Sequence, residues 1–140
     1  MARIDFYVLA QNTHEARLNF AIKLCQKALS HKLQTVVLFD EHAHATQFDA
    51  LLWEAQPESF LPHALFPASA PLPPILLSAS QTIPTNCNYL INLGTQPLPQ
   101  HKPMTRGAEI VIQNDAILNS TRHNFRLYKQ ANHELHMHNL

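Results

Sequence analysis

The sequence predicts an α/β fold built on a mostly parallel sheet, and two observations support this prediction. Short runs of β-branched and aromatic residues alternate along the chain with longer segments of helical periodicity, which is typical of strand–helix–strand units. Residues 35–39 form a continuous apolar run, as expected for a strand that is covered on both faces. We therefore expect parallel strands joined by right-handed crossovers.

The first thirty residues are expected to hold one strand and one helix. Residues 4–9 combine β-branched and aromatic side chains and end in a polar break, so they predict a strand. Residues 15–30 place polar and apolar side chains on opposite sides at helical spacing, so they predict an amphipathic helix. Asn12 followed by Glu15 resembles a capping box, which predicts where this helix begins.

A second strand and a second helix are predicted to follow directly. The strand covers residues 35–39, and Asp40 is expected to cap the next helix. The apolar residues of that helix recur as one buried stripe. The helix should end near Trp53, because Pro57 cannot continue it.

The middle of the chain is rich in proline. Residues 57–74 hold six prolines and no glycine. They predict neither a helix nor a central strand, because proline lacks a backbone donor and fixes φ. An extended proline-rich ligand segment is one interpretation, but a long ordered surface loop suits so short a chain better.

The C-terminal half is expected to complete the sheet and to add a last helix. Asp115 is expected to cap that helix, which runs to about Gln130 at regular helical spacing. Residues 134–139 alternate apolar residues with histidines, which predicts a half-exposed edge strand. The other predicted strands cover residues 75–78, 89–93 and 109–113.

Composition excludes several classes of function. Ten Lys and Arg balance ten Asp and Glu, so the chain lacks the cationic excess that holds a nucleic acid backbone. The two glycines, Gly94 and Gly107, cannot form a phosphate-binding loop, which disfavours a nucleotide-dependent enzyme. The longest apolar runs have about five residues, and the N-terminus is no signal peptide. We expect a soluble, cytoplasmic protein that binds neither DNA nor a membrane directly.

No catalytic motif stands out, but the ten histidines raise a metal hypothesis. Neither a G-x-S-x-G motif nor an H-E-x-x-H motif occurs. His133, His136 and His138 could converge at the C-terminal strand, and with a carboxylate they would suit a small metal-dependent hydrolase or a nucleotide-binding enzyme. The simpler interpretation is a histidine-rich polar face on an edge strand.

The last predicted helix carries a cationic stripe. Arg122, Arg126 and Lys129 are spaced so that they share one face, and Phe125 and Tyr128 border it. Three cations beside aromatic surface suit an acidic peptide with an apolar anchor. A solvated helix face whose cations complement the helix dipole would give the same spacing.

Trp53 and Phe60 form the second informative stretch. Trp53 is the sole tryptophan, and Phe60 lies in the proline-rich segment, where a large apolar residue is hard to bury. Exposed aromatics of this kind are typical interface anchors. Both side chains could equally close the end of the core.

Four motifs carry a resemblance to a known family. They are DFYVL, the LLW…ESFLPHAL block, YLINL and the terminal R-x-x-F-R-x-Y-K helix, in this order along the chain. Together they resemble the chi subunit of bacterial DNA polymerase III over essentially the whole length. The resemblance implies a single Rossmann-like domain over residues 1–140, with three layers and no glycine-rich phosphate loop.

The resemblance further implies a non-catalytic adaptor at bacterial replication forks that needs no cofactor. One expected partner is the psi subunit, which connects chi to the clamp-loader complex. The other is the acidic C-terminal tail of single-stranded DNA-binding protein (SSB), which ends in a Phe. Some family members also bind a helicase at the psi surface, so a helicase is a further candidate partner.

The resemblance also assigns residues to the two binding sites. Leu118 stands where the family often has Lys, and Phe125 where Tyr is common, so we expect weakened but not absent tail binding. The residues expected at the tail site are Arg122, Phe125, Arg126, Trp53 and Leu118, and those expected at the psi site are Phe60, Leu61, Pro62 and His63.

Overall fold

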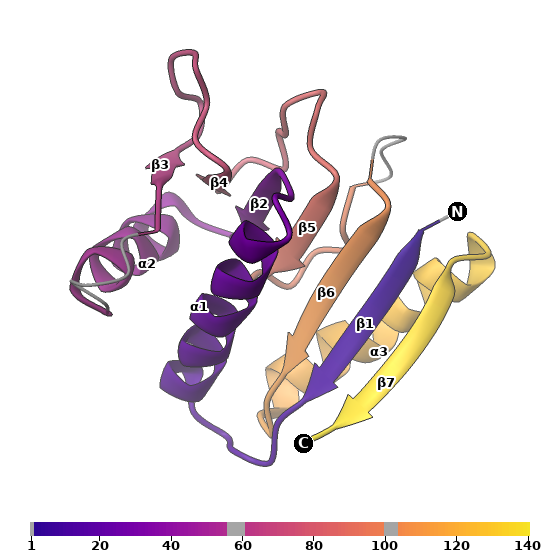
Figure 1. Cartoon of the computed structure of the whole chain (residues 1–140). Helices are drawn as coiled ribbons and strands as arrows, with labels where there is room; N and C mark the ends of the chain where they lie inside the picture. Colours follow the sequence, from indigo (N-terminus) through magenta and orange to yellow (C-terminus); the bar gives the residue numbers. More distant parts are fainter. Residues whose placement is uncertain (1, 56–60, 100–103) are drawn as a thin grey trace.

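One sheet of seven parallel strands forms the centre of the molecule in a computed structural model that describes residues 2–55, 61–99 and 104–140 (Figure 1). The strand order is β3-β4-β2-β5-β6-β1-β7. Every pair of neighbouring strands is parallel, so the predicted α/β fold is confirmed. The strands are β1 (Arg3–Val8), β2 (Thr35–Leu38), β3 (His63–Leu65), β4 (Ile75–Ser78), β5 (Tyr89–Asn92), β6 (Arg106–Val111) and β7 (Glu134–Asn139).

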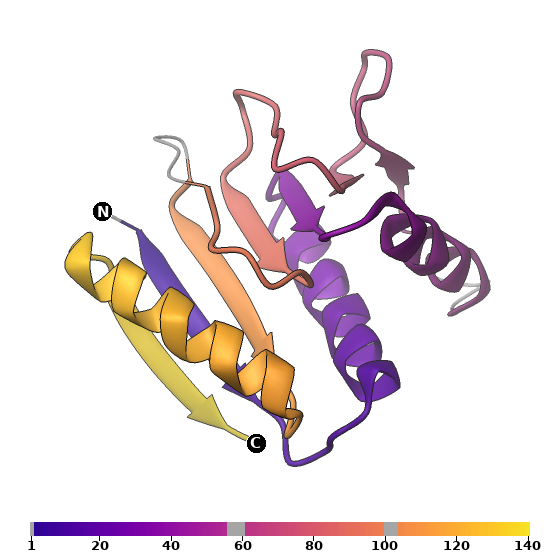
Figure 2. The same cartoon turned by 180° about the vertical axis from the view of Figure 1, so that it is seen from behind.

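Three helices in the described residues cover the two faces of this sheet. α1 (His14–Ser30) and α2 (His42–Ala55) lie on one face, and α3 (Asp115–Gln130) lies on the other (Figures 1 and 2). One hydrophobic cluster joins α1 and α2 to the sheet, and a second one joins α3 to the opposite face. The result is the expected three-layer, Rossmann-like arrangement. None of the helices in these ranges is long and apolar enough to cross a membrane.

The helices begin close to the predicted positions but at different capping residues. Thr13, rather than Asn12, caps α1, because its hydroxyl accepts a hydrogen bond from the Ala16 N–H at 3.2 Å. Asn114, rather than Asp115, caps α3 in the same way. Adjacent Asn, Thr and Asp residues have similar capping chemistry, so the sequence pattern defines a helix start only to within one or two residues.

Asp40 joins two strand ends instead of capping α2. The helix begins at His42, and the Asp40 carboxylate accepts hydrogen bonds from the backbone N–H and the hydroxyl of Thr95, at 2.9 and 2.8 Å. Gly94 permits this approach, because a Cβ there would lie 2.6 Å from the carboxylate. Ligands of α/β proteins usually bind at the carboxyl ends of strands. In this protein, the contact between Asp40 and Thr95 joins the carboxyl ends of β2 and β5 at that edge.

Several element boundaries differ from the sequence prediction, most clearly at β6 and at the end of α2. β6 begins at Arg106, three residues before the predicted strand, because β1 and β5 pair with it on both sides. Gly107 suits this central position, since a Cβ would lie 2.7 Å from Leu98. At the other end of the sheet, α2 continues to Ala55, and the short edge strand β3 lies within the segment predicted as a loop.

Candidate functional site

An open pocket of about 360 Å³ lies between α3 and the edge strand β7. Its floor is apolar and is formed by Phe6 of β1, Phe125 of α3 and Met137 of β7. Arg122 and Arg126 of α3 stand at its rim. The pocket therefore offers an apolar surface beside two guanidinium groups, which is the chemistry of a site for an apolar residue that carries a carboxylate.

The floor of the pocket is held by aromatic packing. The ring of Phe6 is fully buried, and its centroid lies 5.4 Å from that of Phe125 in a tilted arrangement. Such aromatic pairs stabilise a packed surface beyond the area that they bury. Met137 is 55% exposed, so the floor reaches the edge of the sheet.

A buried polar cluster fixes α3 on the sheet beneath the pocket. The Tyr128 hydroxyl donates a hydrogen bond to the Glu109 carboxylate at 2.5 Å, and the Asn92 amide donates another at 2.9 Å. Burial raises the pKa of Glu109, and these hydrogen bonds with the charge of Arg17 offset only part of the rise. Tyr128 therefore lies in the core, and the prediction that it borders the exposed cationic stripe is wrong.

The cations of α3 face solvent. Arg122, Arg126 and Lys129 are all exposed, and Arg122 donates a hydrogen bond to the Asn119 side chain at 3.2 Å. Within the described ranges, none of the three cations forms an ion pair with a carboxylate. The helical spacing thus places the predicted stripe on one face, but only Arg122 and Arg126 line the pocket.

Trp53 and Leu118 do not line the pocket, so the five residues predicted for the tail site do not form one cluster. Trp53 lies on α2, on the opposite face of the sheet and near the β3 edge, whereas the pocket lies near the β7 edge (Figures 1 and 2). Leu118 packs against the hydrophobic cluster below α1 and α2. Motif order along the chain does not indicate which face of the sheet each helix covers.

Trp53 instead projects from the end of the molecule formed by α2 and β3. The residue is 56% exposed, so it is a surface side chain and not part of the core. Its ring centroid lies 5.0 Å from that of His63. The His63 side chain is fully covered, with Nε2 3.1 Å from Asp49 and Nδ1 2.6 Å from the Leu61 carbonyl oxygen. His63 therefore supports Trp53 from below.

The residues predicted for psi binding have different environments. Leu61 is only 5% exposed and belongs to the core, so its side chain is not available to a partner. Pro62 is half-buried. Phe60 lies outside the described residues. In the described part of this end of the molecule, Trp53 is the large apolar side chain that reaches solvent.

The three C-terminal histidines do not converge. Nε2 of His138 lies 2.8 Å from Asp5, and Nε2 of His136 lies 3.4 Å from Glu134. His133 accepts a hydrogen bond from the Ala2 N–H. No group of three His, Cys, Asp or Glu side chains could hold one metal ion in the described part of the chain. The convergence that the metalloenzyme hypothesis required is therefore not formed.

Sequence reasoning missed two residues of the pocket floor, Phe6 and Met137. The two lie opposite each other, because β1 and β7 are parallel neighbours in register. The period-2 alternation of residues 134–139 does place Met137 on the apolar face of its strand. Which strand would lie beside it depends on the strand order, which the alternation does not contain.

Comparisons with known proteins agree with the resemblance found in the motifs. Residues 1–136 match the family model described as DNA polymerase III chi subunit, HolC. DNA polymerase III subunit chi of Pseudomonas aeruginosa strain PAO1 is 33% identical to the chain over 141 residues. The match covers 100% of this chain and 98% of that relative.

Proposed function

The chain belongs to the family of DNA polymerase III chi subunits, and from this membership we propose that it is a non-catalytic adaptor between two protein partners. One partner is the acidic C-terminal tail of SSB, and the other is the psi subunit. Through psi the chain would reach the clamp-loader complex. Its own contribution would be binding, without a cofactor.

The pocket on α3 is the observation that supports tail binding. A terminal Phe ring would pack on Phe125 and Met137, above the buried ring of Phe6, and its free carboxylate would meet Arg122 and Arg126 at the rim. Arginine presents planar pairs of donors that match a carboxylate. Lys129, one turn further along the helix, would attract the acidic residues that precede the Phe.

The exposed Trp53 supports psi binding at the other end of the sheet. A large aromatic side chain that is held by a covered neighbour suits an interface anchor. The surface around Trp53 and Pro62 would receive psi or a competing helicase. Phe60 lies outside the described residues, so it stays a psi contact predicted from the family resemblance alone. The β3 and β7 edges lie at opposite ends of the sheet, so both partners could bind at once.

A titration with three forms of an SSB tail peptide tests the proposed pocket. The first form is complete, the second lacks the last Phe, and the third carries an amide in place of the terminal carboxylate. We expect the second form to bind at least about tenfold more weakly, because it loses the buried ring. The third form should bind about fivefold more weakly than the complete peptide, because its amide cannot form the charged contact with the arginines.

The same titration can reject the pocket. Equal binding of the complete peptide and the peptide without Phe would show that the apolar floor does not hold the tail. Absence of binding by the complete peptide would remove the tail from the list of partners. A competition with glutamate-rich peptide of the same net charge controls for simple charge attraction.

A further inference from the structure

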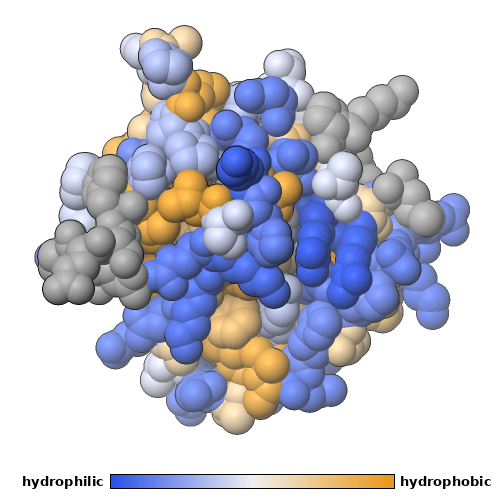
Figure 3. Space-filling model, in the orientation of Figure 1, coloured by the Kyte–Doolittle hydropathy of each residue, from blue (hydrophilic) through white to orange (hydrophobic). Residues whose placement is uncertain are grey.

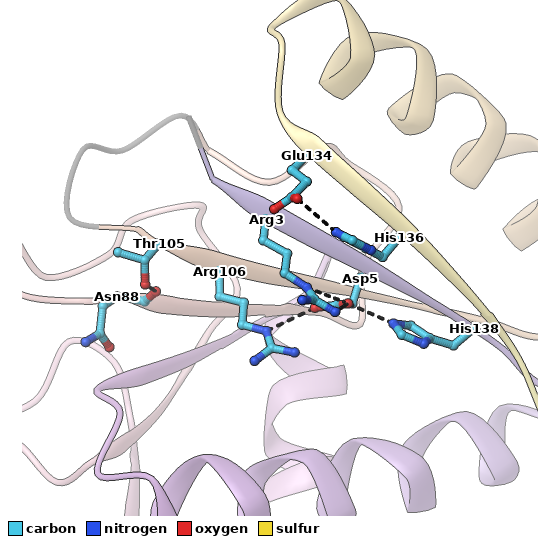
Figure 4. Close-up of polar contacts among 8 residues, drawn as sticks. All are labelled: Arg3, Asp5, Asn88, Thr105, Arg106, Glu134, His136 and His138. Carbon is cyan, nitrogen blue, oxygen red and sulfur yellow. Dashed lines mark hydrogen bonds and ion pairs between the residues drawn. The ribbon is translucent and has the colours of Figure 1, made fainter.

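On the face of the sheet that carries α1 and α2, the helices of the described residues leave β1 and β7 largely uncovered. Figure 1 shows α1 lying over the middle of the sheet, where it packs against β6, while neither described helix of this face lies in front of β1 and β7. The surface here is mostly hydrophilic (Figure 3). Alternation places Arg3 and Asp5 of β1 on this face, together with Arg106 of β6 and His138 of β7 (Figure 4). This region is separate from the α3 pocket, which lies on the other face.

Asp5 is the buried centre of this region. Its Oδ1 accepts hydrogen bonds from Nε and Nη2 of Arg3 at 3.1 and 3.0 Å, and its Oδ2 accepts one from Nε of Arg106 at 3.0 Å (Figure 4). Burial alone would raise the pKa of Asp5, but hydrogen bonds from His138, Arg3 and Arg106 outweigh burial and hold it below the ordinary value of 3.8. One carboxylate thus neutralises only one of two guanidinium charges.

The two arginines keep donors for an external acceptor. Their side chains are 39% and 40% exposed, whereas Asp5 is covered. Figure 4 shows both Nη groups of Arg106 pointing away from Asp5, and because Arg106 also forms a side-chain hydrogen bond with Tyr7, part of its donors is left for an external acceptor. Because Asp5 holds the guanidinium groups in place, little side-chain entropy is lost when an anion binds to them.

A groove extends this cationic region toward α1. Arg106 lines the groove together with Tyr7, Tyr89, Lys27 from the last turn of α1 and His31, the residue that caps the end of α1. Lys27 and His31 are exposed. Glu134 of β7 lies opposite Arg3 in the strand register, and among the ion pairs of the described residues its carboxylate contacts His136. We call Arg3, Arg106 and Lys27 the arginine face.

We infer that the arginine face is a second binding site, for an acidic segment of a protein partner whose carboxylates meet Arg3, Arg106 and Lys27. The charge of the face is complementary to such a segment, and the forked donors of arginine match carboxylates. Single-stranded nucleic acid fits less well, because it needs open aromatic rings for base stacking. The Tyr7 ring is stacked on His138 at 5.0 Å, and Tyr89 is buried.

An octaglutamate peptide with a C-terminal amide is a suitable probe, since it lacks both the terminal Phe and the terminal carboxylate. Every chain in the experiment carries Arg122→Gln and Arg126→Gln, so that α3 contributes few charges and the outcome does not depend on the proposed tail site. Binding is measured by fluorescence anisotropy at low salt, because such contacts are screened at high salt.

Two variants test the site, and one matched variant is the control. Asp5→Asn combined with Arg106→Gln keeps the net charge of the chain and should weaken octaglutamate binding about tenfold. Lys27→Gln is an exposed change on α1 and should weaken it about threefold. Lys23→Gln removes the same charge one turn earlier, away from the groove, and should leave binding unchanged.

Three results would overturn the inference. The first is no octaglutamate binding to the background chain, and the second is equal binding to all the variants. The third is tighter binding of a single-stranded oligonucleotide of equal charge, weakened by the same substitutions, which would identify a nucleic acid surface instead. Lys27→Gln keeps the test valid should the double variant at Asp5 and Arg106 fail to fold.

Discussion

Two pairs of arginines lie on opposite faces of the sheet, and they differ in what holds them. Arg122 and Arg126 project from α3 beside an apolar floor, with no carboxylate paired to either in the described residues. Arg3 and Arg106 lie on adjacent strands and share the buried carboxylate of Asp5. Within the described ranges, the first pair has no buried carboxylate to compensate and makes only a hydrogen bond from Arg122 to the exposed Asn119 side chain, whereas the second pair compensates the charge of Asp5.

Because of this difference, we expect substitutions at the first pair to affect ligand binding and substitutions at the second pair to affect the stability of the fold. A cation that has no partner in the protein can be removed with little effect on folding, because both states leave it in water. Removal of a cation that compensates a buried carboxylate lowers the stability of the fold, because the carboxylate charge is then left without a counter-charge in the core. Substitutions at the two pairs should therefore differ most in the free energy of unfolding.

The largest expected effect is that of Asp5→Ala. It removes the acceptor shared by Arg3 and Arg106 and should lower the free energy of unfolding by about 2 kcal/mol, less than for a fully buried ion pair because both guanidinium groups reach water. Urea denaturation monitored by circular dichroism measures this loss. Arg126→Ala is the control and should change the same free energy by less than about 0.5 kcal/mol.

If Asp5→Ala and Arg126→Ala lowered the free energy of unfolding equally, the proposed difference in stability between the two arginine pairs would be wrong. A larger loss in Arg126→Ala would show that α3 depends on its exposed cations for stability. The buried Glu109–Tyr128 contact gives no reason to expect that result, since it fixes α3 independently of the arginines.

The pH dependence of stability should show a smaller effect at the same carboxylate. The folded protein lowers the pKa of Asp5, so its ionised form stabilises the fold above the ordinary value of 3.8, and this contribution is lost as the pH falls through the lowered value. The difference in unfolding free energy between the natural chain and Asp5→Asn should therefore shrink between neutral and strongly acidic pH. A constant difference would mean that the charge of Asp5 does not stabilise the fold.

The sequence predicted local features of this molecule better than its long-range contacts. Alternation of strand and helix patterns is local, so the fold class and most elements could be predicted. The spacing of Arg122 and Arg126 is also local, and helix geometry alone places them on one face. The Asp5 cluster joins residues that lie 101 and 133 positions away in the chain, and no periodicity indicates such pairings.

The environment of Trp53 also depends on long-range contacts that local sequence patterns do not contain. Its exposure, and the covered His63 below it, follow from how α2 packs beside β3. The sequence left open whether Trp53 is a surface or a core side chain, and it could not place Trp53 relative to Phe125, because the face that a crossover helix covers depends on the strand order. Capping residues were missed for a different reason, since neighbouring Asn, Thr and Asp can each cap a helix.

Arg122→Ala should reduce binding of the complete SSB tail peptide about fivefold, the loss expected for one charged contact at the pocket rim. Isothermal titration calorimetry measures this change. Association with psi, followed by co-purification, should be unaffected because Trp53 lies at the other end of the sheet. Loss of both activities together would mean that the two sites are not separate.

Trp53→Ala is the converse control for that experiment. It should weaken association with psi and leave tail binding at its original affinity, because Trp53 does not line the α3 pocket. The side chain is exposed, so its removal should cost little stability. A change in the affinity for the tail peptide would show that Trp53 contributes to the tail site after all.

Lys129→Ala should have the smallest effect, and it tests how far the tail site extends along α3. Lys129 is exposed on the same stripe as Arg126 but lies outside the pocket lining. Its interaction with an acidic segment passes through solvent, so removal should weaken tail binding less than about twofold, with a difference that disappears at high salt. A loss as large as that of Arg122→Ala, persisting at high salt, would place the carboxylate of the tail one turn further along the helix.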